Sequence, residues 1–460
     1  MKRSTGSSDD RQELYRRYLR ENPRMLRAVE SVQPSDDPVS LVCGYVLAPA
    51  LGAFTQWLLE CAMANGVRRL YFLARDGYFF CQAAQLFCRT YRLPVECRYL
   101  SCSRYSLRIP LFHRDLETAL DYVCRSGLHV TPEKLLGRAG LSGEETEHVL
   151  SALALPCGKN DIIPYTALPE IRQRLKSCDD FLVRMEKHSR ESLPNLSGYL
   201  KQEGLLENIA DAIVDSGWTG SMQKSLGDVL AYMGRTRTLE GYYWGLYELP
   251  ADVKRSSYHS YYFSPESRLR EKVHFNNCLF EAVYTAPHGM TLGYMHEGKN
   301  VAPFYGDISA ARKAFVERVG DYLMRYIRQL TKEEWRPADF TADKAVLYRL
   351  FKAFMGRPSP QEAEVFGSLP FSDDVLEGRE QPIAAPLSQR ELRANHALPR
   401  LLAMAGLRKS GFRESAWYEG SAVRNGVHIR RHRHQNILYQ YLRHGRKTLL
   451  ACKRRRKGAS

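Results

Sequence analysis

The sequence predicts an α/β protein with a doubly wound, mainly parallel Rossmann-like sheet, a helical insertion and a mostly helical, basic C-terminal region. Three observations predict this class. Apolar segments such as Arg69–Ala74 alternate with helical segments, as strands do in a parallel sheet that helices cover on both faces. Strand-like segments become scarce over residues 114–207 and return afterwards. Basic side chains gather near the C-terminus.

The first elements follow from local patterns. Residues 1–37 are polar and predict a leading helix around Arg11–Val32, ended by Pro34. Residues 38–113 are expected to form the first part of the α/β domain. They begin with Val39–Leu59, which carries no charge over 21 residues and is long enough to span a bilayer. Its glycines, its proline and the strand-like segment that follows favour a helix buried against the sheet.

The first two predicted strands end in polar loops. The strand Arg69–Ala74 runs into Arg75-Asp76-Gly77 and is followed by a helix over Tyr78–Arg92. The second strand, Val95–Cys102, follows Pro94 and leads into Ser103-Arg104. These loops are expected at the same edge of the sheet, because the carboxyl ends of parallel strands lie together.

The later elements complete the predicted domain plan. Residues 114–207 predict a helical insertion or cap, and 208–305 the second part of the α/β domain. The expected elements of this second part are strands at Ile209–Val214, Leu239–Tyr247 and Tyr258–Phe263, a helix at Ser221–Met233, and a hairpin over 291–305. Residues 306–380 are expected to be helical, and 381–460 a linker and basic tail, with the linker around Gln381–Pro386.

Composition excludes several protein classes. The chain has 460 residues, 44% of them hydrophobic and 26% charged, which excludes collagen-like, mostly disordered and disulfide-scaffold proteins. Eleven scattered cysteines without a C-x-x-C pair predict reduced thiols rather than disulfides or a zinc site. The N-terminus lacks an apolar signal segment, so a cytoplasmic location is expected, with the inner face of the membrane as a candidate site of peripheral attachment.

The positive charge is confined to one end of the chain. The net charge is +16, yet residues 390–460 hold 18 Lys and Arg against 3 Asp and Glu, a balance of +15. The other 389 residues balance at +1. This distribution excludes a uniform nucleic-acid-binding coat and leaves a tail that seeks polyanions.

The strongest chemical signal is the segment 213–223. Here an apolar strand is followed by Asp215, by a loop that contains glycine, and then by the start of a helix. Backbone N–H groups at a helix start attract phosphate, and neighbouring hydroxyls add hydrogen bonds. Asp215 is a candidate for holding ribose hydroxyls or Mg²⁺, and for catalysis. The other candidate ligand-binding residues of this loop are Ser216, Gly217, Trp218, Thr219, Gly220, Ser221 and Gln223. The alternatives are a tight turn with Thr219 as N-cap, and a Trp218 that anchors the loop in the core.

Other segments add candidates. Arg75 is expected to clamp a phosphate or carboxylate, and Asp76 to bind a metal or transfer protons, unless the two cap the helix as a pair. Gly77, Ser103 and Arg104 extend this set. Glu281 lies in an apolar stretch where a carboxylate needs a partner, and His288 is the candidate catalytic histidine, with a structural histidine as the alternative. Walker, G-x-G-x-x-G, H-E-x-x-H and G-x-S-x-G motifs are absent from the sequence.

The runs "GYVLAPALGAFTQWLLECAMANGVRRLYFLARDGYFF", "YLSCSRYSLRIPL", "VDSGWTGSMQKSL" and "FEAVYTAPHG" resemble one bacterial family. They are similar to the C-terminal region of predicted HAD-superfamily hydrolases encoded with surface-polysaccharide biosynthesis genes. The resemblance covers roughly Val39 to Tyr305. It implies phosphate chemistry, but no D-x-D occurs in the chain. Laid on the HAD motif, Ala74 takes the place of the nucleophile, and Asp76 matches the second aspartate.

The Asp215 loop is also similar to the phosphoribosyltransferase phosphate loop, in which an acidic residue holds ribose hydroxyls and a Thr-Gly turn holds a 5′-phosphate. The resemblance would give these roles to Asp215 and to Thr219-Gly220-Ser221, although the second acidic neighbour of that loop is missing. This departure leaves the handling of magnesium diphosphate open.

Two functions therefore remain open. The first is a cytoplasmic protein that acts on a phosphorylated sugar or nucleotide in surface-polysaccharide assembly, with Mg²⁺ as candidate cofactor. The alternative is an inactive scaffold that recruits polysaccharide-biosynthesis enzymes. The tail 427–460 predicts a basic amphipathic helix that binds an anionic membrane surface or such enzymes, with nucleic acid as the less favoured partner.

Overall fold

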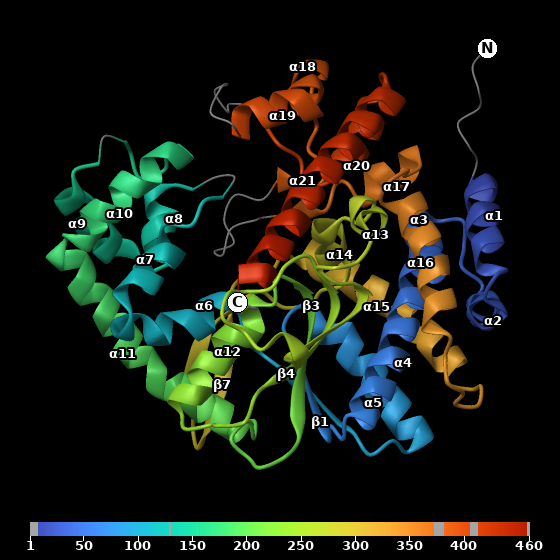
Figure 1. Cartoon of the computed structure of the whole chain (residues 1–460), viewed down its shortest axis with the longest axis horizontal. Coiled ribbons are helices and arrows are strands. Elements are labelled where there is room, and N and C mark those ends of the chain that lie inside the picture. Colours follow the sequence, from blue (N-terminus) through green and yellow to red (C-terminus); the bar gives the residue numbers. More distant parts are fainter. Residues whose placement is uncertain (1–7, 128–129, 156, 372–380, 405–412, 458–460) are drawn as a thin grey trace.

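The centre of the protein is a five-stranded sheet in which all strands are parallel and follow the order β2-β1-β3-β4-β5. This computed structural model describes residues 8–127, 130–155, 157–371, 381–404 and 413–457. The predicted α/β class with a doubly wound sheet is confirmed (Figure 1). The strands of this sheet are β1 (Arg69–Leu73), β2 (Glu96–Leu100), β3 (Asp211–Trp218), β4 (Glu240–Leu246) and β5 (Tyr258–Phe263).

Both faces of the sheet are covered. Successive side chains of a strand point to opposite faces, so β1 places Leu70 and Phe72 in one apolar core and Tyr71 and Leu73 in another. The elements on the first face include α4 (Ala48–Ala64), α5 (Gly77–Tyr91), α15 (Ala310–Leu330) and α16 (Phe340–Phe354). Those on the second are α6 (Arg104–Arg108), α11 (Asp179–Gln202), α12 (Ser221–Tyr232) and the antiparallel hairpin β6 (Thr291–Glu297) and β7 (Asn300–Tyr305).

The apolar segment near the N-terminus lies inside the protein. Within the described part of the chain, one helix, Pro38–Ala64, is long and apolar enough to cross a membrane. In its apolar 18-residue stretch, 94% is buried inside the protein. It comprises α3 (Pro38–Val42), a π-helical turn (Cys43–Leu47) and α4. Phe54 packs edge-on against Phe80, with ring centroids 4.8 Å apart. The prediction that this segment packs in the core is confirmed.

The N-terminal region is divided where one helix was expected. The structure has α1 (Ser8–Leu19) and α2 (Pro23–Val32) instead of a single helix over Arg11–Val32. Pro23 is at the first position of α2, and the Asn22 side chain caps that helix by accepting a hydrogen bond from the Met25 N–H at 3.1 Å. A proline and an N-cap asparagine start a new helix rather than continue an old one.

The middle of the chain forms a helical unit with its own apolar core, set to one side of the sheet in Figure 1. Where a helical insertion was expected, its helices are α7 (Leu116–Val123), α8 (Pro132–Gly137), α9 (Gly143–Leu153), α10 (Leu168–Lys176) and α11, with short 3₁₀ turns at Ile109–Arg114 and Tyr165–Ala167. The 24-residue helix α11 leads the chain back to the sheet and packs against the β6–β7 hairpin.

The C-terminal region is folded onto the body. Residues 381–460 were expected to be a linker and a tail, but Ile383, Ala384 and Ala385 are fully buried, and the indole N–H of Trp417 donates to the Met355 carbonyl at 2.8 Å. Sequence composition did not indicate this burial, because the contacts come from residues far apart in the chain. The remaining helices are α13 (Leu269–Val273), α14 (Asn277–Val283), α17 (Pro360–Val365), α18 (Gln389–Ala394), α19 (Ala397–Met404), α20 (Tyr418–Asn425) and α21 (Ile429–Lys457), with a 3₁₀ turn at Arg255–Ser257 and the short pair β8 (Pro370–Phe371) and β9 (Gln381–Pro382).

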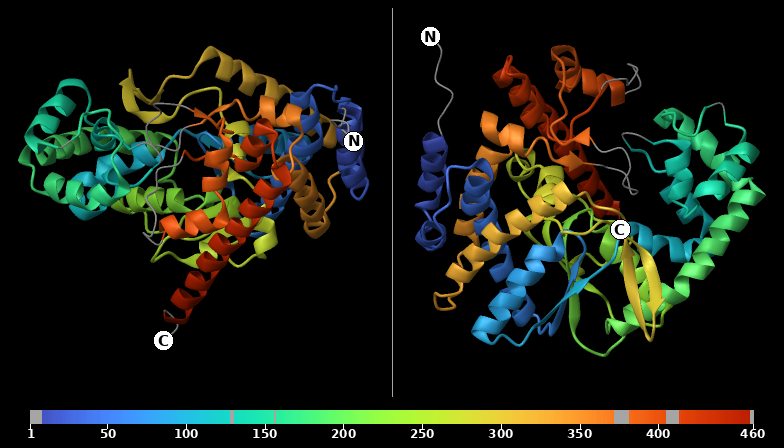
Figure 2. Two further views of the ribbon diagram at one scale, coloured as in Figure 1. Left: turned by 90° about the horizontal axis from the view of Figure 1, so that it is seen from above. Right: turned by 180° about the vertical axis from the view of Figure 1, so that it is seen from behind.

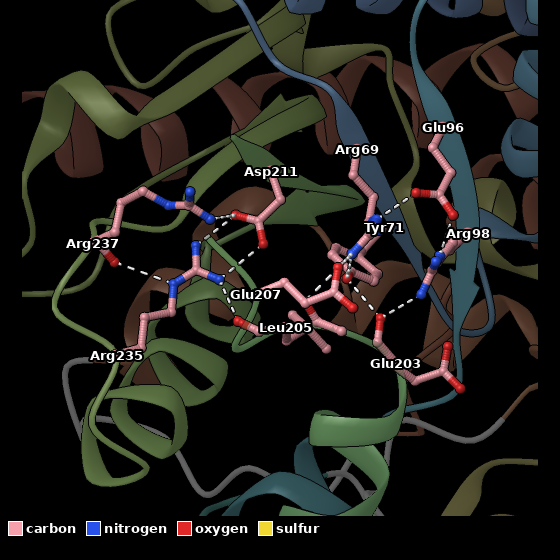
Figure 3. Close-up of polar contacts among 11 residues, drawn as sticks. Arg69, Tyr71, Glu96, Arg98, Glu203, Leu205, Glu207, Asp211, Arg235 and Arg237 are labelled. Atoms are coloured by element: carbon pink, nitrogen blue, oxygen red, sulfur yellow. Dashed lines mark hydrogen bonds and ion pairs between the residues drawn. The ribbon is translucent and has the colours of Figure 1, made fainter. Parts of the chain in front are cut away.

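Ion pairs hold the amino ends of the central strands (Figure 3). Arg235 and Arg237 converge on the buried carboxylate of Asp211, the first residue of β3, at 2.6 and 2.9 Å. Arg69, the first residue of β1, is bound by Glu96 at 2.5 Å and Glu207 at 2.8 Å. These contacts set the starts of neighbouring strands, while the opposite edge of the sheet is left to the candidate site.

Replacing Asp211 by alanine tests this edge. The Arg235 side chain is 7% exposed, so the substitution leaves a buried guanidinium without its carboxylate partner. We expect the free energy of unfolding in urea to fall by about 3–5 kcal/mol. Glu334→Ala, which removes an exposed ion pair to Arg336, should change it by less than about 1 kcal/mol. Equal losses in the two variants would contradict the structural role of Asp211.

Candidate functional site

A cavity of about 850 Å³ lies at the carboxyl ends of the strands. β1 pairs with β2 on one side and with β3 on the other. The helix after β1, α5, packs on one face of the sheet, and the helix after β3, α12, packs on the opposite face. The loops after β1 and β3 therefore diverge, and the cavity lies at this topological switch point, where doubly wound sheets bind ligands.

The structure brings the three predicted strand-end loops together in this cavity. The predicted site residues that line it are Arg75, Asp76, Ser103, Arg104, Asp215, Ser216, Gly217, Trp218, Thr219, Ser221 and Glu281. Asp215 and Ser216 are buried in the wall, whereas Arg104 is exposed. The carboxylates therefore lie deeper than this cation.

Asp76 is joined to the neighbouring strand rather than to its own helix. It takes the N-cap position of α5, but its side chain makes no capping hydrogen bond. Instead, the Ser216 hydroxyl donates to Asp76 Oδ2 across the switch point. The alternative in which Arg75 and Asp76 cap the helix as a pair is therefore wrong for Asp76, whose side chain makes no cap and which lines the cavity.

Three carboxyl groups in the cavity hold protons more tightly than exposed acids do. Burial, and then the charge of Glu281, raise the pKa of Asp76 well above its usual range and that of Asp215 to about 7. Burial also raises the pKa of Glu281, against the opposing effect of a hydrogen bond from the indole N–H of Trp218. Such a cluster can carry a proton near neutral pH, which a general acid requires.

The strand β3 is longer than predicted. It continues to Trp218, because Gly217 and Trp218 pair with Gly245 and Leu246 of β4, and this pairing outweighs the turn preference of the local sequence. Gly217 has φ +110°, and an added Cβ would lie 2.4 Å from the Gly245 carbonyl oxygen. The helix α12 then starts at the N-cap Gly220, with φ +62° and no side-chain cap. The alternative of Thr219 as N-cap is therefore wrong.

Trp218 both lines the cavity and anchors the loop. Its ring packs against Phe275 and Phe280 with centroids 5.6 and 5.8 Å apart, and its N–H binds Glu281. Its φ of +66° is uncommon for a bulky residue. The surrounding aromatic core holds this conformation and keeps Trp218 in hydrogen-bond contact with Glu281.

Several predicted residues have structural partners instead. Gln223 is buried, donates to the Leu239 carbonyl at 2.7 Å and accepts from Tyr243 at 2.6 Å, so it ties α12 to β4. Gly77 packs closely on Phe72. The residues found to line the cavity include none of Gln223, Gly77, Gly220 and His288.

His288 and Ser103 are held by neighbours. His288 Nδ1 donates to the Gly289 carbonyl at 2.8 Å, so in the neutral ring Nε2 accepts from Tyr99 at 2.9 Å. Burial lowers the pKa of His288, which keeps the ring neutral. These contacts match the structural alternative for this histidine. The Ser103 hydroxyl caps α6 and donates to the Thr291 carbonyl at 2.7 Å, so it already has protein partners where it lines the cavity.

Sequence reasoning missed much of the cavity wall. Residues from the far C-terminal region line it, and so does the start of α14. Those from α19, α20 and α21 are Arg400, Tyr418, Glu419, Asn436, Tyr439, Gln440, Arg443, His444 and Lys447. In the sequence these residues form only the polar face of a basic helix. Such a face has the same sequence pattern whether it contacts solvent or lines a cavity.

The donor set limits how a metal ion would bind. Over the described ranges, no group of three or more His, Cys, Asp or Glu side chains is arranged to hold a metal. Mg²⁺ commonly takes one or two carboxylates and completes its shell with phosphate oxygens and water. Asp215 therefore fits Mg²⁺ only together with a phosphorylated ligand.

Comparison with known proteins adds no assignment. No protein-family model matches the chain, and no curated protein matches it.

A pair of glycine substitutions tests the loop geometry. Gly217→Ala should lower the free energy of unfolding by about 2 kcal/mol or more, because of its positive φ and the contact with Gly245. Gly227→Ala, in the interior of α12 with open space around its Cα, should raise it by up to about 1 kcal/mol. Urea unfolding measures both, and equal effects would contradict the loop as described.

The pH dependence of stability tests the carboxyl cluster. The pKa of Asp215 is raised from 3.8 to about 7, so the folded protein binds this proton more tightly than the unfolded chain does. The free energy of unfolding therefore falls as pH rises through this window. Asp215→Asn removes the effect, and its stability relative to wild type should grow by on the order of 1–3 kcal/mol between pH 5 and pH 8. Asp228→Asn, which changes an exposed carboxylate on α12, is the control, and a pH-independent difference for Asp215→Asn would contradict the cluster.

Proposed function

We propose that the protein binds a phosphorylated sugar or nucleotide in this cavity and acts on it by phosphoryl or glycosyl-phosphate chemistry. The observation that carries the proposal is the convergence of the three strand-end loops, which sets hydroxyl donors and cations beside a proton-holding carboxyl cluster. Cavities of this size hold ligands as large as a nucleotide sugar.

The phosphate would bind at the start of α12. This 12-residue helix has glycine at its N-cap and no side-chain cap, so its first N–H groups are left for another acceptor. Thr219 and Ser221 line the cavity on either side of Gly220 and would add hydroxyl donors. Arg75 and Arg104 would neutralise the phosphate oxygens, and Arg104, being exposed, would meet the ligand first.

The sugar hydroxyls would face the carboxyl cluster. Phosphate is repelled by carboxylates, whereas hydroxyl groups donate to them, so a ligand that carries both suits a cavity with deep acids and an exposed arginine. Among the described residues, the cavity lining holds seven Asp and Glu side chains and seven Lys and Arg side chains, together with His444. This balance favours a sugar phosphate over inorganic phosphate alone.

Asp76 would transfer the proton. Its pKa is well above the usual range, and of the two predicted proton-transfer groups it is the one that lines the cavity. It would donate the proton to the bridging oxygen as the bond to phosphorus or to the anomeric carbon breaks. Ala74 stands where the HAD resemblance requires a nucleophile, so water or a second substrate would attack without an aspartyl-phosphate intermediate.

Asp215 would hold ribose or sugar hydroxyls, or a Mg²⁺ ion shared with the ligand phosphate. Mg²⁺, when bound, would supply charge neutralisation at the phosphate. The cellular setting that goes with this proposal is cytoplasmic surface-polysaccharide assembly, and it rests on the resemblance of segments between Val39 and Tyr305.

Ligand titration tests the proposal. Sugar phosphates, nucleotide sugars and phosphoribosyl diphosphate are titrated by thermal shift and calorimetry, with and without Mg²⁺. At least one should raise the melting temperature of the wild type, and Asp215→Ala or Arg104→Ala should weaken its binding by about tenfold or more.

Arg336→Ala, which changes an exposed arginine outside the cavity lining, is the matched control and should bind as the wild type does. If no compound in the panel binds, or if Asp215→Ala and Arg104→Ala bind as tightly as the control, the scaffold function is favoured instead.

A further inference from the structure

The C-terminal helix α21 lies in a stretch of the chain whose charged side chains are all positive. Residues 420–460 contain 12 Lys and Arg and no Asp or Glu, while the residues before 390 are close to neutral. Such a segment adds repulsion to the folded protein unless anions surround it. Its charge therefore points to an anionic partner outside the chain.

One face of α21 belongs to the cavity. Asn436, Tyr439, Gln440, Arg443, His444 and Lys447 line it, and at 100° per residue they span about 140° of the helix circumference. Lys447 pairs with Glu248 at 3.1 Å, and His444 stacks on Tyr247 with ring centroids 5.0 Å apart. The helix is thus fixed to the body by this face.

The opposite face is apolar and uncovered. Leu438, Tyr441, Leu442 and Leu449 are 48%, 38%, 44% and 67% exposed. Leu438, Leu442 and Leu449 are spaced by four and seven residues, so they form one stripe, about 200° around the helix from Asn436. A row of exposed apolar side chains on a basic helix is typical of a surface that binds a protein or a membrane.

Basic side chains frame this stripe. Arg430, Arg431, His434 and Arg446 are exposed at positions beside it or in line with it. We name this surface the outer face of α21: the apolar residues Leu438, Tyr441, Leu442 and Leu449 with these four basic residues. In the left view of Figure 2, the C-terminal end of α21 projects beyond the rest of the protein.

We propose that the outer face of α21 docks on an anionic membrane surface. A bilayer interface takes up both features together, since leucine and tyrosine side chains enter the boundary of the acyl chains while arginines bind the headgroups. Binding to a nucleic-acid backbone uses the cations and gains nothing from the leucines. The apolar stripe therefore decides between these two anionic partners.

Docking in this way would leave the cavity face of α21 turned toward the body. The helix would then join two sites, the cavity on one side and the lipid headgroups on the other. The proposal is independent of the ligand of the cavity, because it depends on the outer face alone.

Vesicle binding tests the proposal on the full chain, because α21 packs against α13 and α20 and its deletion would open the cavity. Wild-type protein should co-sediment with vesicles of phosphatidylcholine and phosphatidylglycerol and not with phosphatidylcholine alone. The double variant Leu438→Ser, Leu442→Ser keeps the charge and should bind the anionic vesicles about tenfold more weakly or worse.

The matched control is Ile162→Ser with Val183→Ser, two apolar residues that are 56% and 68% exposed in the helical insertion, and it should bind as the wild type does. Near-ultraviolet circular dichroism checks that each variant is folded. No binding of the wild type to anionic vesicles would overturn the proposal. Equal binding of the leucine variant and the wild type to anionic vesicles would also overturn it. If, in addition, both proteins bind duplex DNA equally well, the surface is a general polyanion site rather than a membrane site.

Discussion

The parallel pairing of β1 with β3 is the contact on which the candidate site depends. Its register, from Arg69 with Asp211 to Phe72 with Val214, brings together two strands separated in sequence by the whole helical insertion. As a result, Asp76 and Ser216 share a hydrogen bond although they are 140 residues apart. The ion pairs of the two buried residues Arg69 and Asp211 at the opposite edge hold the starts of both strands, so the carboxyl-end loops are presented on a rigid frame.

Burying three carboxyl groups beside one another disfavours folding, and the structure offsets this cost elsewhere. The aromatic core around Trp218 and Phe280 fixes Glu281, and the two sheet faces each have a large apolar core. A fold selected only for stability would not place like charges together in this way. The arrangement is typical of a site that gives up stability for the ability to hold and move a proton.

Much of the frame was predictable from sequence because buried parallel strands read as apolar runs; β5, for example, spans Tyr258–Phe263 as predicted. The extension of β3 through Gly217 was not predictable, since it depends on pairing with Gly245. Likewise, the local sequence does not show that Gln223 accepts a hydrogen bond from Tyr243, or that Asn436 and Arg443 line the cavity. Strand-end loops can be read from sequence, whereas walls supplied by distant helices cannot.

We propose that the start of α12 and the carboxyl cluster hold two parts of one ligand. A crystal structure of the protein with a bound sugar phosphate or nucleotide sugar tests this most directly. We expect phosphate oxygens to lie within hydrogen-bond distance of the N–H or hydroxyl groups of Thr219–Ser221, and ligand hydroxyls to face Asp76 or Asp215. Phosphate bound only by the exposed arginines of α21, with the carboxyl cluster untouched, would contradict it.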